Sequence, residues 1–199
     1  MMNKLIRLLN PSKFVALHRN LQFRVAALCG AGLRVTERAC IFPHQARRSA
    51  ISIGENSCID GTIEVYNDGV LSIGRNFFLG RSRLYCSGNM RIGDYVLISD
   101  NVAIMDGDLH PMQASDRRRA ADQWSAGNFP HIPPAEDKSS IKIDDDVWIG
   151  YGVVILKGVS IGRGAIIGAG SIVTSDVPPW CIAVGSPARV IRELSEDER

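Results

Sequence analysis

Residues 143–173 read IDDDVWIGYGVVILKGVSIGRGAIIGAGSIV. An aliphatic side chain recurs in this stretch at every sixth position: Ile143, Ile149, Ile155, Ile161, Ile167 and Val173. Small or β-branched residues stand four places after the first five of these: Val147, Val153, Val159, Ala165 and Ser171. A period of six fits neither an α-helix, which repeats every ~3.6 residues, nor a single strand, which repeats every two. It predicts an all-β solenoid with three sides to a coil, in which each side is a short strand with one aliphatic side chain inside.

The same register continues toward the N-terminus and predicts about five coils. The first inward residues of these coils are Ile53, Ile73, Ile92, Ile143 and Ile161. Successive steps between them are 20, 19, 51 and 18 residues, and we expect the surplus at one surface corner, where solenoids accept insertions. Tyr85 is the weakest inward position, because its ring is large for an interior slot. A partial coil ahead of Ile53 would be built on Val35 and Ile41.

Composition fits a folded protein with an uneven distribution of charge. The 199 residues are 45% hydrophobic, and the formal net charge is +2 at pH 7. We expect a basic helical segment at 1–34, a β-helix domain at 35–184 with a long loop at 107–140, and a C-terminal extension at 185–199. The chain beyond residue 34 is net acidic and has no nucleic-acid-binding motif, so we expect no nucleic-acid partner. No signal peptide and no membrane-spanning apolar run are visible, which predicts a cytoplasmic protein.

Four short segments occur together in a fixed order. They are GDLHP at 107–111, VWIG at 147–150, GAGSIVT at 168–174 and GSPARVIR at 185–192. Together they resemble the hexapeptide-repeat acetyltransferases, which include galactoside, maltose and nodulation-factor enzymes and the O-acetyltransferases of bacterial surface-polysaccharide synthesis. The resemblance covers roughly residues 50–192. It implies a left-handed parallel β-helix, acetyl-CoA as cosubstrate, no metal, and a homotrimer with active sites between neighbouring β-helices.

Acetyl transfer to a hydroxyl needs a base for the hydroxyl proton and donors for the oxyanion. His110 is the candidate base, because GDLHP resembles the family's catalytic-histidine segment and because the long insertion begins at this corner. Two readings of Asp108 stay open: it orients the imidazole, as the acid does in a catalytic triad, or it only caps a turn. Among the other histidines, His44 is a second candidate, for a position at the border of an acceptor site. His18 and the loop residue His131 are assigned no catalytic role.

The resemblance also implies that coenzyme A lies along the outside of the last coils. The implied contacts are Trp148, Gly150, Tyr151, Gly168, Ala169, Thr174, Ser175, Arg189 and Arg192. The chain departs from the family pattern at Ser175, where lysine is common, and at Tyr151, where a small residue is common. Trp148 follows the inward Val147, so its side chain should point outward, toward a neighbouring protomer or the active site. A backbone N–H near Gly150 or Tyr151 is the expected oxyanion donor.

Two segments of the chain bear on the identity of the acceptor. The D-x-H-P form and the long loop favour the polysaccharide branch, and Arg117, Arg118 and Arg119 are candidate contacts for a sugar acceptor that carries phosphate. Residues 1–28 mix leucines with basic side chains, and either cap the solenoid or contact the inner face of a membrane. Serine or a nucleotide-linked amino sugar stays open as the acceptor. A zinc lyase resembling γ-carbonic anhydrases and a non-catalytic structural β-helix are the alternatives from other classes.

Overall fold

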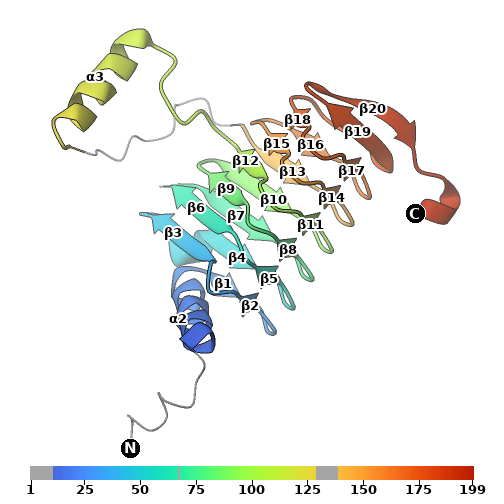
Figure 1. Ribbon diagram of the computed structural model, residues 1–199, viewed down its shortest axis with the longest axis horizontal. Coiled ribbons are helices and arrows are strands. Elements are labelled where there is room, and N and C mark those ends of the chain that lie inside the picture. Colours follow the sequence, from blue (N-terminus) through green and yellow to red (C-terminus); the bar gives the residue numbers. More distant parts are fainter. Residues whose placement is uncertain (1–10, 67, 129–138) are drawn as a thin grey trace, which may run out of the picture.

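The computed structural model describes residues 11–66, 68–128 and 139–199. Short strands wind into a triangular solenoid whose coils stack along one axis, as Figure 1 shows. Within each of three sheets, strands of consecutive coils are parallel neighbours, and among the described strands only the last pair, β19 and β20, is antiparallel. The predicted left-handed parallel β-helix is therefore confirmed.

The three sheets form the three sides of the solenoid. Sheet A contains β1 (Leu28–Cys29), β4 (Ile51–Ile53), β7 (Val70–Ile73), β10 (Asn89–Ile92), β13 (Ile141–Ile143) and β16 (Ser160–Ile161). Sheet B contains β2 (Arg34–Val35), β5 (Cys58–Ile59), β8 (Phe78–Leu79), β11 (Leu97–Ile98), β14 (Trp148–Ile149), β17 (Ile166–Ile167), β19 (Cys181–Gly185) and β20 (Ala188–Glu193). Sheet C contains β3 (Cys40–His44), β6 (Thr62–Tyr66), β9 (Arg83–Cys86), β12 (Ala103–Met105), β15 (Val154–Ile155) and β18 (Ile172–Val173).

The solenoid is longer than the expected five coils. The described residues form six complete coils, and β19 begins a seventh. The additional complete coil consists of β1, β2 and β3, and it starts at Leu28, ahead of residue 35. Val35 and Ile41 do belong to this coil, but on β1 the place beside Ile53 is taken by Cys29. A cysteine in an aliphatic position made the first coil hard to see in the periodicity.

The expectation that Tyr85 points inward is wrong. On β9 the inward residue is Leu84, which is fully buried and pairs with Ile63 and Ile104 in the adjacent coils. The reason is a tight corner between sheets B and C, where a Cβ on Gly61 would lie 2.5 Å from a backbone oxygen of the next coil. In the second and third coils fewer residues turn this corner, since Ile63 follows Ile59 by four places and Leu84 follows Leu79 by five. The six-residue count therefore runs one place too far on β9, and Tyr85 falls on the outer face.

Both open ends of the solenoid are covered. Helix α2 (Pro11–Ala26) lies across the first coil, where Phe23 is fully buried and the Asn20 side chain donates a hydrogen bond to the carbonyl of Leu33 at 3.1 Å. Arg48, in the 3-10 turn η1 (Arg48–Ala50), donates to the carbonyl of Ala27 at 3.3 Å. At the other end β19 and β20 form a hairpin, followed by the 3-10 turn η2 (Glu196–Glu198). Within the described ranges, no helix has the length and apolar character to cross a bilayer.

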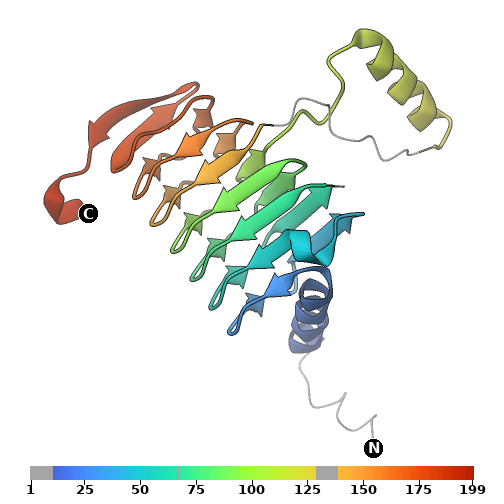
Figure 2. The ribbon, with the colours of Figure 1, turned by 180° about the vertical axis from the view of Figure 1, so that it is seen from behind.

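One long excursion interrupts the regular winding between β12 and β13, as the insertion in the sequence predicts. It carries helix α3 (Ala114–Ser125), and Figures 1 and 2 show this helix standing clear of the coils. Ala120 is the only buried residue of α3. Residues 129–138, which include His131, lie outside the described part of the chain.

Candidate functional site

The two ends of the excursion are tied together by Asp106, which directly follows β12. Its side chain is fully buried and accepts hydrogen bonds from the backbone N–H of Ser87 at 2.7 Å, the Ser87 hydroxyl at 2.9 Å and the N–H of Gly88 at 2.9 Å. The Asp106 carbonyl accepts a further hydrogen bond from the N–H of Ser139 at 3.0 Å, where the excursion returns. The segment that carries His110 is therefore fixed to the wall at its root.

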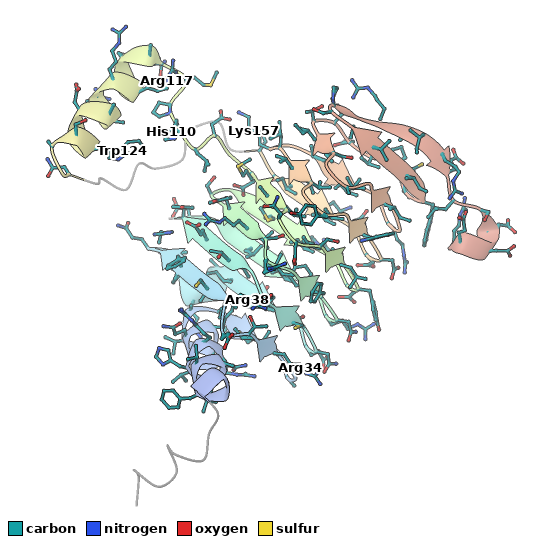
Figure 3. All side chains as sticks on the ribbon, in the orientation of Figure 1. Arg34, Arg38, His110, Arg117, Trp124 and Lys157 are labelled. Atoms are coloured by element: carbon teal, nitrogen blue, oxygen red, sulfur yellow. The ribbon has the colours of Figure 1, made fainter. Side chains whose placement is uncertain are left out.

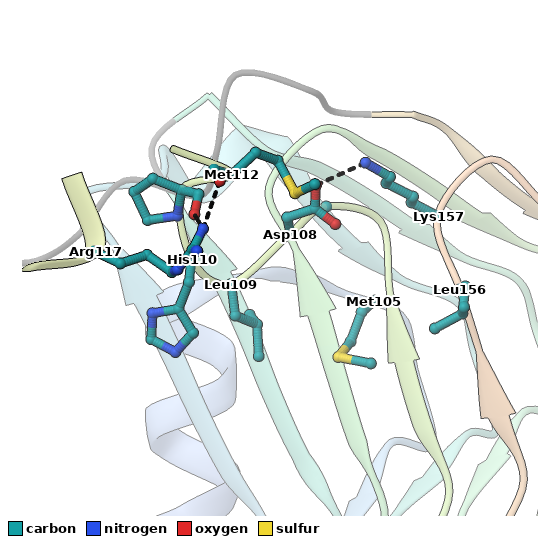
Figure 4. A pocket seen from close by; sticks show the side chains of 10 residues that line it. Met105, Asp108, Leu109, His110, Met112, Arg117, Leu156 and Lys157 are labelled. Carbon is teal, nitrogen blue, oxygen red and sulfur yellow. Dashed lines mark hydrogen bonds and ion pairs between the residues drawn. The ribbon is translucent and has the colours of Figure 1, made fainter. Parts of the chain in front are cut away.

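An open pocket of about 520 Å³ lies at the edge of sheet C, beneath this segment. Met105 and Leu156 form its apolar floor, and Asp108, His110, Arg117 and Lys157 supply its polar groups, as Figure 4 shows. The floor residues follow the buried Ile104 and Ile155, which pair in adjacent coils, so the pocket rests on two neighbouring strands. A pocket with an apolar floor and a few convergent polar groups is the usual form of a small-ligand site.

His110 is exposed, and its ring makes an edge-to-face contact with Trp124 of α3, with centroids 5.6 Å apart. Figure 3 shows both side chains on the excursion rather than on the wall. Asp108 does not approach His110: its Oδ2 lies 2.7 Å from the Nζ of Lys157, and Figure 4 shows the carboxylate turned toward this ammonium group. The structure thus brings Asp108 and His110 into one pocket but pairs Asp108 with Lys157.

The three consecutive arginines have different surroundings. Arg117 donates hydrogen bonds from one guanidinium nitrogen to the carbonyls of Pro111 and Met112 and so holds the loop beside His110. Arg119 pairs with Asp116 on its own helix at 2.9 Å. Arg118 is exposed on α3. Two of the three guanidinium groups are thus already engaged within the excursion, and the role of all three toward an acceptor stays a prediction.

Two of the implied coenzyme A contacts, Gly150 and Tyr151, lie at the corner between sheets B and C. A Cβ on Gly150 would lie 2.8 Å from the backbone nitrogen of Ala169, so glycine is needed there for the close approach of the next coil. The N–H of Gly150 donates to the carbonyl of Ile167 at 2.8 Å, which makes it unsuitable as an oxyanion donor. Tyr151 is 59% exposed beside this corner. Gly168 is also set by packing, since a Cβ there would lie 2.6 Å from the side chain of Val184.

The remaining proposed cofactor residues lie on different faces. Trp148 is 51% exposed on the outside of sheet B, and its predicted outward direction is confirmed. Thr174 and Ser175 are exposed after β18, at the end of sheet C. Arg189 is exposed on β20, whereas Arg192 is held by both carboxylate oxygens of Glu198, at 2.6 and 2.9 Å.

The Arg192 pair is reflected in the titration of its partner. Hydrogen bonds from Arg192, and then from Ser195, lower the pKa of Glu198 to about 2. At neutral pH the carboxylate is therefore charged and holds the guanidinium group, which leaves Arg189 as the better placed of the two arginines for a phosphate.

Two residues of the site are absent from the sequence-based assignment. Lys157 follows the pocket residue Leu156 and pairs with Asp108, and Asp106 anchors the His110 segment. The only sequence signal that the two share is their position: each is a charged residue two places after an inward isoleucine, Ile104 or Ile155. As for the zinc alternative, the described residues of one chain bring together no group of three His, Cys, Asp or Glu side chains that could hold a metal ion.

Comparison with known proteins agrees with this geometry. Residues 140–175 match the family described as bacterial transferase hexapeptide (six repeats). The chain is 36% identical over 150 residues to the galactoside O-acetyltransferase of Escherichia coli K12, covering 74% of this chain and 66% of the relative. It is 38% identical over 144 residues to the polysialic acid O-acetyltransferase of Escherichia coli O1:K1, covering 71% of this chain and 42% of the relative. The chain thus spans between about two fifths and two thirds of these relatives.

Two solved structures share the fold. The N-acyltransferase AntD of Bacillus cereus, in complex with dTDP-4-amino-4,6-dideoxyglucose and coenzyme A, has a TM-score of 0.68 at 21% identity, with 90% of each chain covered. The hexapeptide-repeat acetyltransferase VCA0836 of Vibrio cholerae, in complex with acetyl-CoA, has a TM-score of 0.57 at 26% identity, covering 90% of this chain and 78% of the other.

Proposed function

We propose that this chain, which belongs to the hexapeptide-repeat transferase family, transfers the acetyl group of acetyl-CoA to a hydroxyl of a sugar. The sugar belongs to a bacterial surface polysaccharide or to its lipid- or nucleotide-linked precursor. The observation that carries the proposal is the position of His110. It lines an open pocket at the edge of sheet C, whose apolar floor is formed by Met105 and Leu156.

In the proposed reaction His110 is the general base and the transfer is direct. The acceptor hydroxyl gives its proton to the imidazole while its oxygen attacks the thioester carbonyl carbon. The tetrahedral intermediate then collapses, the C–S bond breaks, and the imidazolium returns the proton to the departing sulfur. The products are an O-acetyl ester and free coenzyme A. The N–H of Tyr151 is the proposed oxyanion donor, since that of Gly150 is engaged within the wall.

Lys157 and Asp108 have a supporting role in this proposal. Their ion pair is about 30% exposed at both side chains and spans the pocket from β15 to the His110 segment. It therefore fixes the lower part of that segment against the last coils. The relatives support the acceptor class, because both are named for O-acetylation of sugars.

The test is acetyl-CoA turnover on a panel of acceptors, followed by release of free thiol. The panel contains nucleotide- and lipid-linked sugars, simple galactosides, serine and amino-sugar nucleotides. A general base contributes ~10²–10⁴ in rate, so His110→Ala should lower kcat by at least about 100-fold while the affinity for coenzyme A stays unchanged. His18→Ala, an exposed histidine on α2, is the matched control and should retain full activity. A His110→Ala variant that keeps a tenth of the wild-type kcat, with chemistry rate-limiting, would overturn the assignment.

We further propose a homotrimer that packs through the outer face of sheet B. Three large apolar side chains form a row across neighbouring strands of this face. They are Phe78, Leu97 and Trp148, with exposed fractions of 38%, 49% and 51%. An apolar row on a flat wall is typical of a subunit contact, and a three-fold axis closes such a contact into a ring.

Helix α2 supports a second role for the N-terminal segment. Phe14, Leu17, Leu21 and Val25 lie on one side of the helix and are between 51% and 68% exposed, whereas the capping residue Phe23 lies on the opposite side. Residues 1–34 contain six basic and no acidic side chains. We propose that this apolar stripe contacts the anionic inner face of a membrane while the other side of α2 caps the coil.

A further inference from the structure

The outer face of sheet C carries an ordered group of aromatic and polar side chains on its first three coils. The rings of Phe42, His44 and Tyr66 are stacked, with centroids 6.0 Å and 4.4 Å apart in succession. The Tyr66 hydroxyl donates to a carboxylate oxygen of Glu64 at 2.6 Å, and the Nε2 of His44 lies 3.4 Å from the same oxygen. With Tyr85 on the next strand, these residues form what we term the aromatic platform.

The platform lies in line with the His110 pocket. In the parallel register of sheet C, Phe42 pairs with Glu64, Glu64 with Tyr85, and Tyr85 with Met105. Met105 forms the floor of the pocket. The strands are about 4.8 Å apart, so the row runs ~14 Å from the pocket to Phe42. That length exceeds one sugar ring.

The same row continues past the pocket toward the last coil. Because Ile104 pairs with Ile155, and Ile155 with Val173, the positions that follow them are also neighbours. They are Met105, Leu156 and Thr174, the last of which is one of the proposed coenzyme A contacts. One outer row of sheet C thus joins the platform, the pocket and the proposed cofactor side in a single line.

The chemistry of the platform suits a sugar chain better than a second protein copy. Aromatic rings offer apolar faces, and carboxylate, hydroxyl and guanidinium groups beside them can bond to sugar hydroxyls. Arg83 adds such a group, since it donates to the Tyr85 hydroxyl at 3.2 Å and is itself exposed. The polar groups are already fixed by one another, so little ordering is lost on binding. The purely apolar row of sheet B fits a protein contact better.

We infer that the aromatic platform binds the part of an oligosaccharide acceptor that lies away from the reacting hydroxyl. The terminal or internal sugar that is acetylated lies over Met105 below His110, and the following units cross β9, β6 and β3. This inference rests on the proposed sugar O-acetyltransferase function and adds its specificity. The enzyme prefers a chain of two or more sugar units to a monosaccharide.

The experiment compares kcat/KM for a length series of acceptors. The probes are one- to four-unit oligomers of glucose, galactose and N-acetylglucosamine, each with saturating acetyl-CoA. For the sugar that is turned over, we expect kcat/KM to rise at least about 10-fold from one to three units. Each aromatic contact contributes about 3- to 10-fold to kcat/KM. Phe42→Ala and Tyr85→Ala should therefore each lower kcat/KM for the three-unit sugar by that factor and leave kcat/KM for the monosaccharide unchanged.

Val70→Ala is the matched control, because Val70 is as exposed as Phe42 and lies on sheet A of the same coil as Tyr85. It should leave the length dependence intact. Equal kcat/KM at every length, or platform variants that behave like the control, would overturn this inference and leave the proposed function standing. Failure to acetylate any sugar would overturn both. If the protein dissociates into single chains in Phe42→Ala but not in Val70→Ala, the outer face of sheet C is a subunit contact, and this result would also overturn the inference.

Discussion

The buried carboxylate of Asp106 makes a prediction about stability that can be worked directly from its contacts. In the substitution Asp106→Asn, one carboxylate oxygen becomes an NH₂ group. The side chain accepts three hydrogen bonds, from the N–H and hydroxyl of Ser87 and from the N–H of Gly88, and it is fully buried. An asparagine can accept hydrogen bonds at its one oxygen only. If that oxygen keeps the two bonds from Ser87, the amide NH₂ group faces the backbone N–H of Gly88, which is also a donor.

The expected cost follows from these contacts. A hydrogen bond to a charged group contributes ~1.5–3 kcal/mol, and a buried donor left without a partner costs ~1–3 kcal/mol. Since one accepting atom is lost and the N–H that bonded to it is left without a partner, the two terms together lower the free energy of unfolding of Asp106→Asn by about 2.5–6 kcal/mol. The root of the excursion should loosen as well. A shift of ~1 Å at a catalytic group can cost ~10²-fold in rate, so we expect kcat to fall by more than 10-fold.

The assay is urea unfolding followed by tryptophan fluorescence, at one fixed protein concentration because association shifts apparent stability. Asp144→Asn is the control, since Asp144 pairs with Lys142 at 2.8 Å but both side chains are more than one third exposed. Such a pair contributes ~0.2–1 kcal/mol. If the two variants unfold within about 0.5 kcal/mol of each other, the argument that Asp106 clamps the excursion is refuted.

Three further predictions follow from the exposed groups. Arg189→Gln should raise the KM for acetyl-CoA about 10-fold, and Arg192→Gln less than 3-fold, because Glu198 already holds Arg192. The measurement is steady-state kinetics at saturating acceptor, and the reverse order of the two effects would contradict Arg189 as the main phosphate contact. Sedimentation equilibrium should give a mass of three 21.7 kDa chains, and Trp148→Arg should weaken this trimer, whereas a monomer at micromolar concentration contradicts it. Leu21→Glu should lower binding to phosphatidylglycerol vesicles about 10-fold or more in a co-sedimentation assay. Equal binding by the wild type and the variant would exclude the apolar stripe of α2 as the membrane contact.

The fold was predictable because the wall repeats one physical requirement. Each side of a coil needs a single inward aliphatic residue, so six consecutive positions at period six are hard to obtain by any other fold. The prediction failed where the requirement was met differently. On β1 a cysteine takes the inward place, and at β9 a short corner moves Leu84 inward in place of Tyr85.

The site was predictable only in part, because it is built from contacts between coils rather than from a period. The GDLHP segment located His110, and the structure places it in a pocket. Proximity in sequence suggested Asp108 as its partner, but the ammonium group of Lys157, which arrives 49 residues later on the next coil, takes the carboxylate instead. Residues that come together across the excursion leave no signal in a linear count. The role of His110 itself, and of the proposed coenzyme A contacts, stays a prediction.

The openness of the pocket in a single chain has a consequence for the mechanism. Transfer to a sugar hydroxyl competes with water, so a working site has to exclude water during attack. In one chain His110 is exposed, α3 stands clear of the wall, and Trp124 and Met112 are 39% and 76% exposed. Apolar side chains of this size on a projecting arm are positioned to pack against another subunit. In the proposed trimer this packing would cover the pocket from outside, so that dissociation of the trimer should abolish transfer even though every residue of the pocket is still present in each chain.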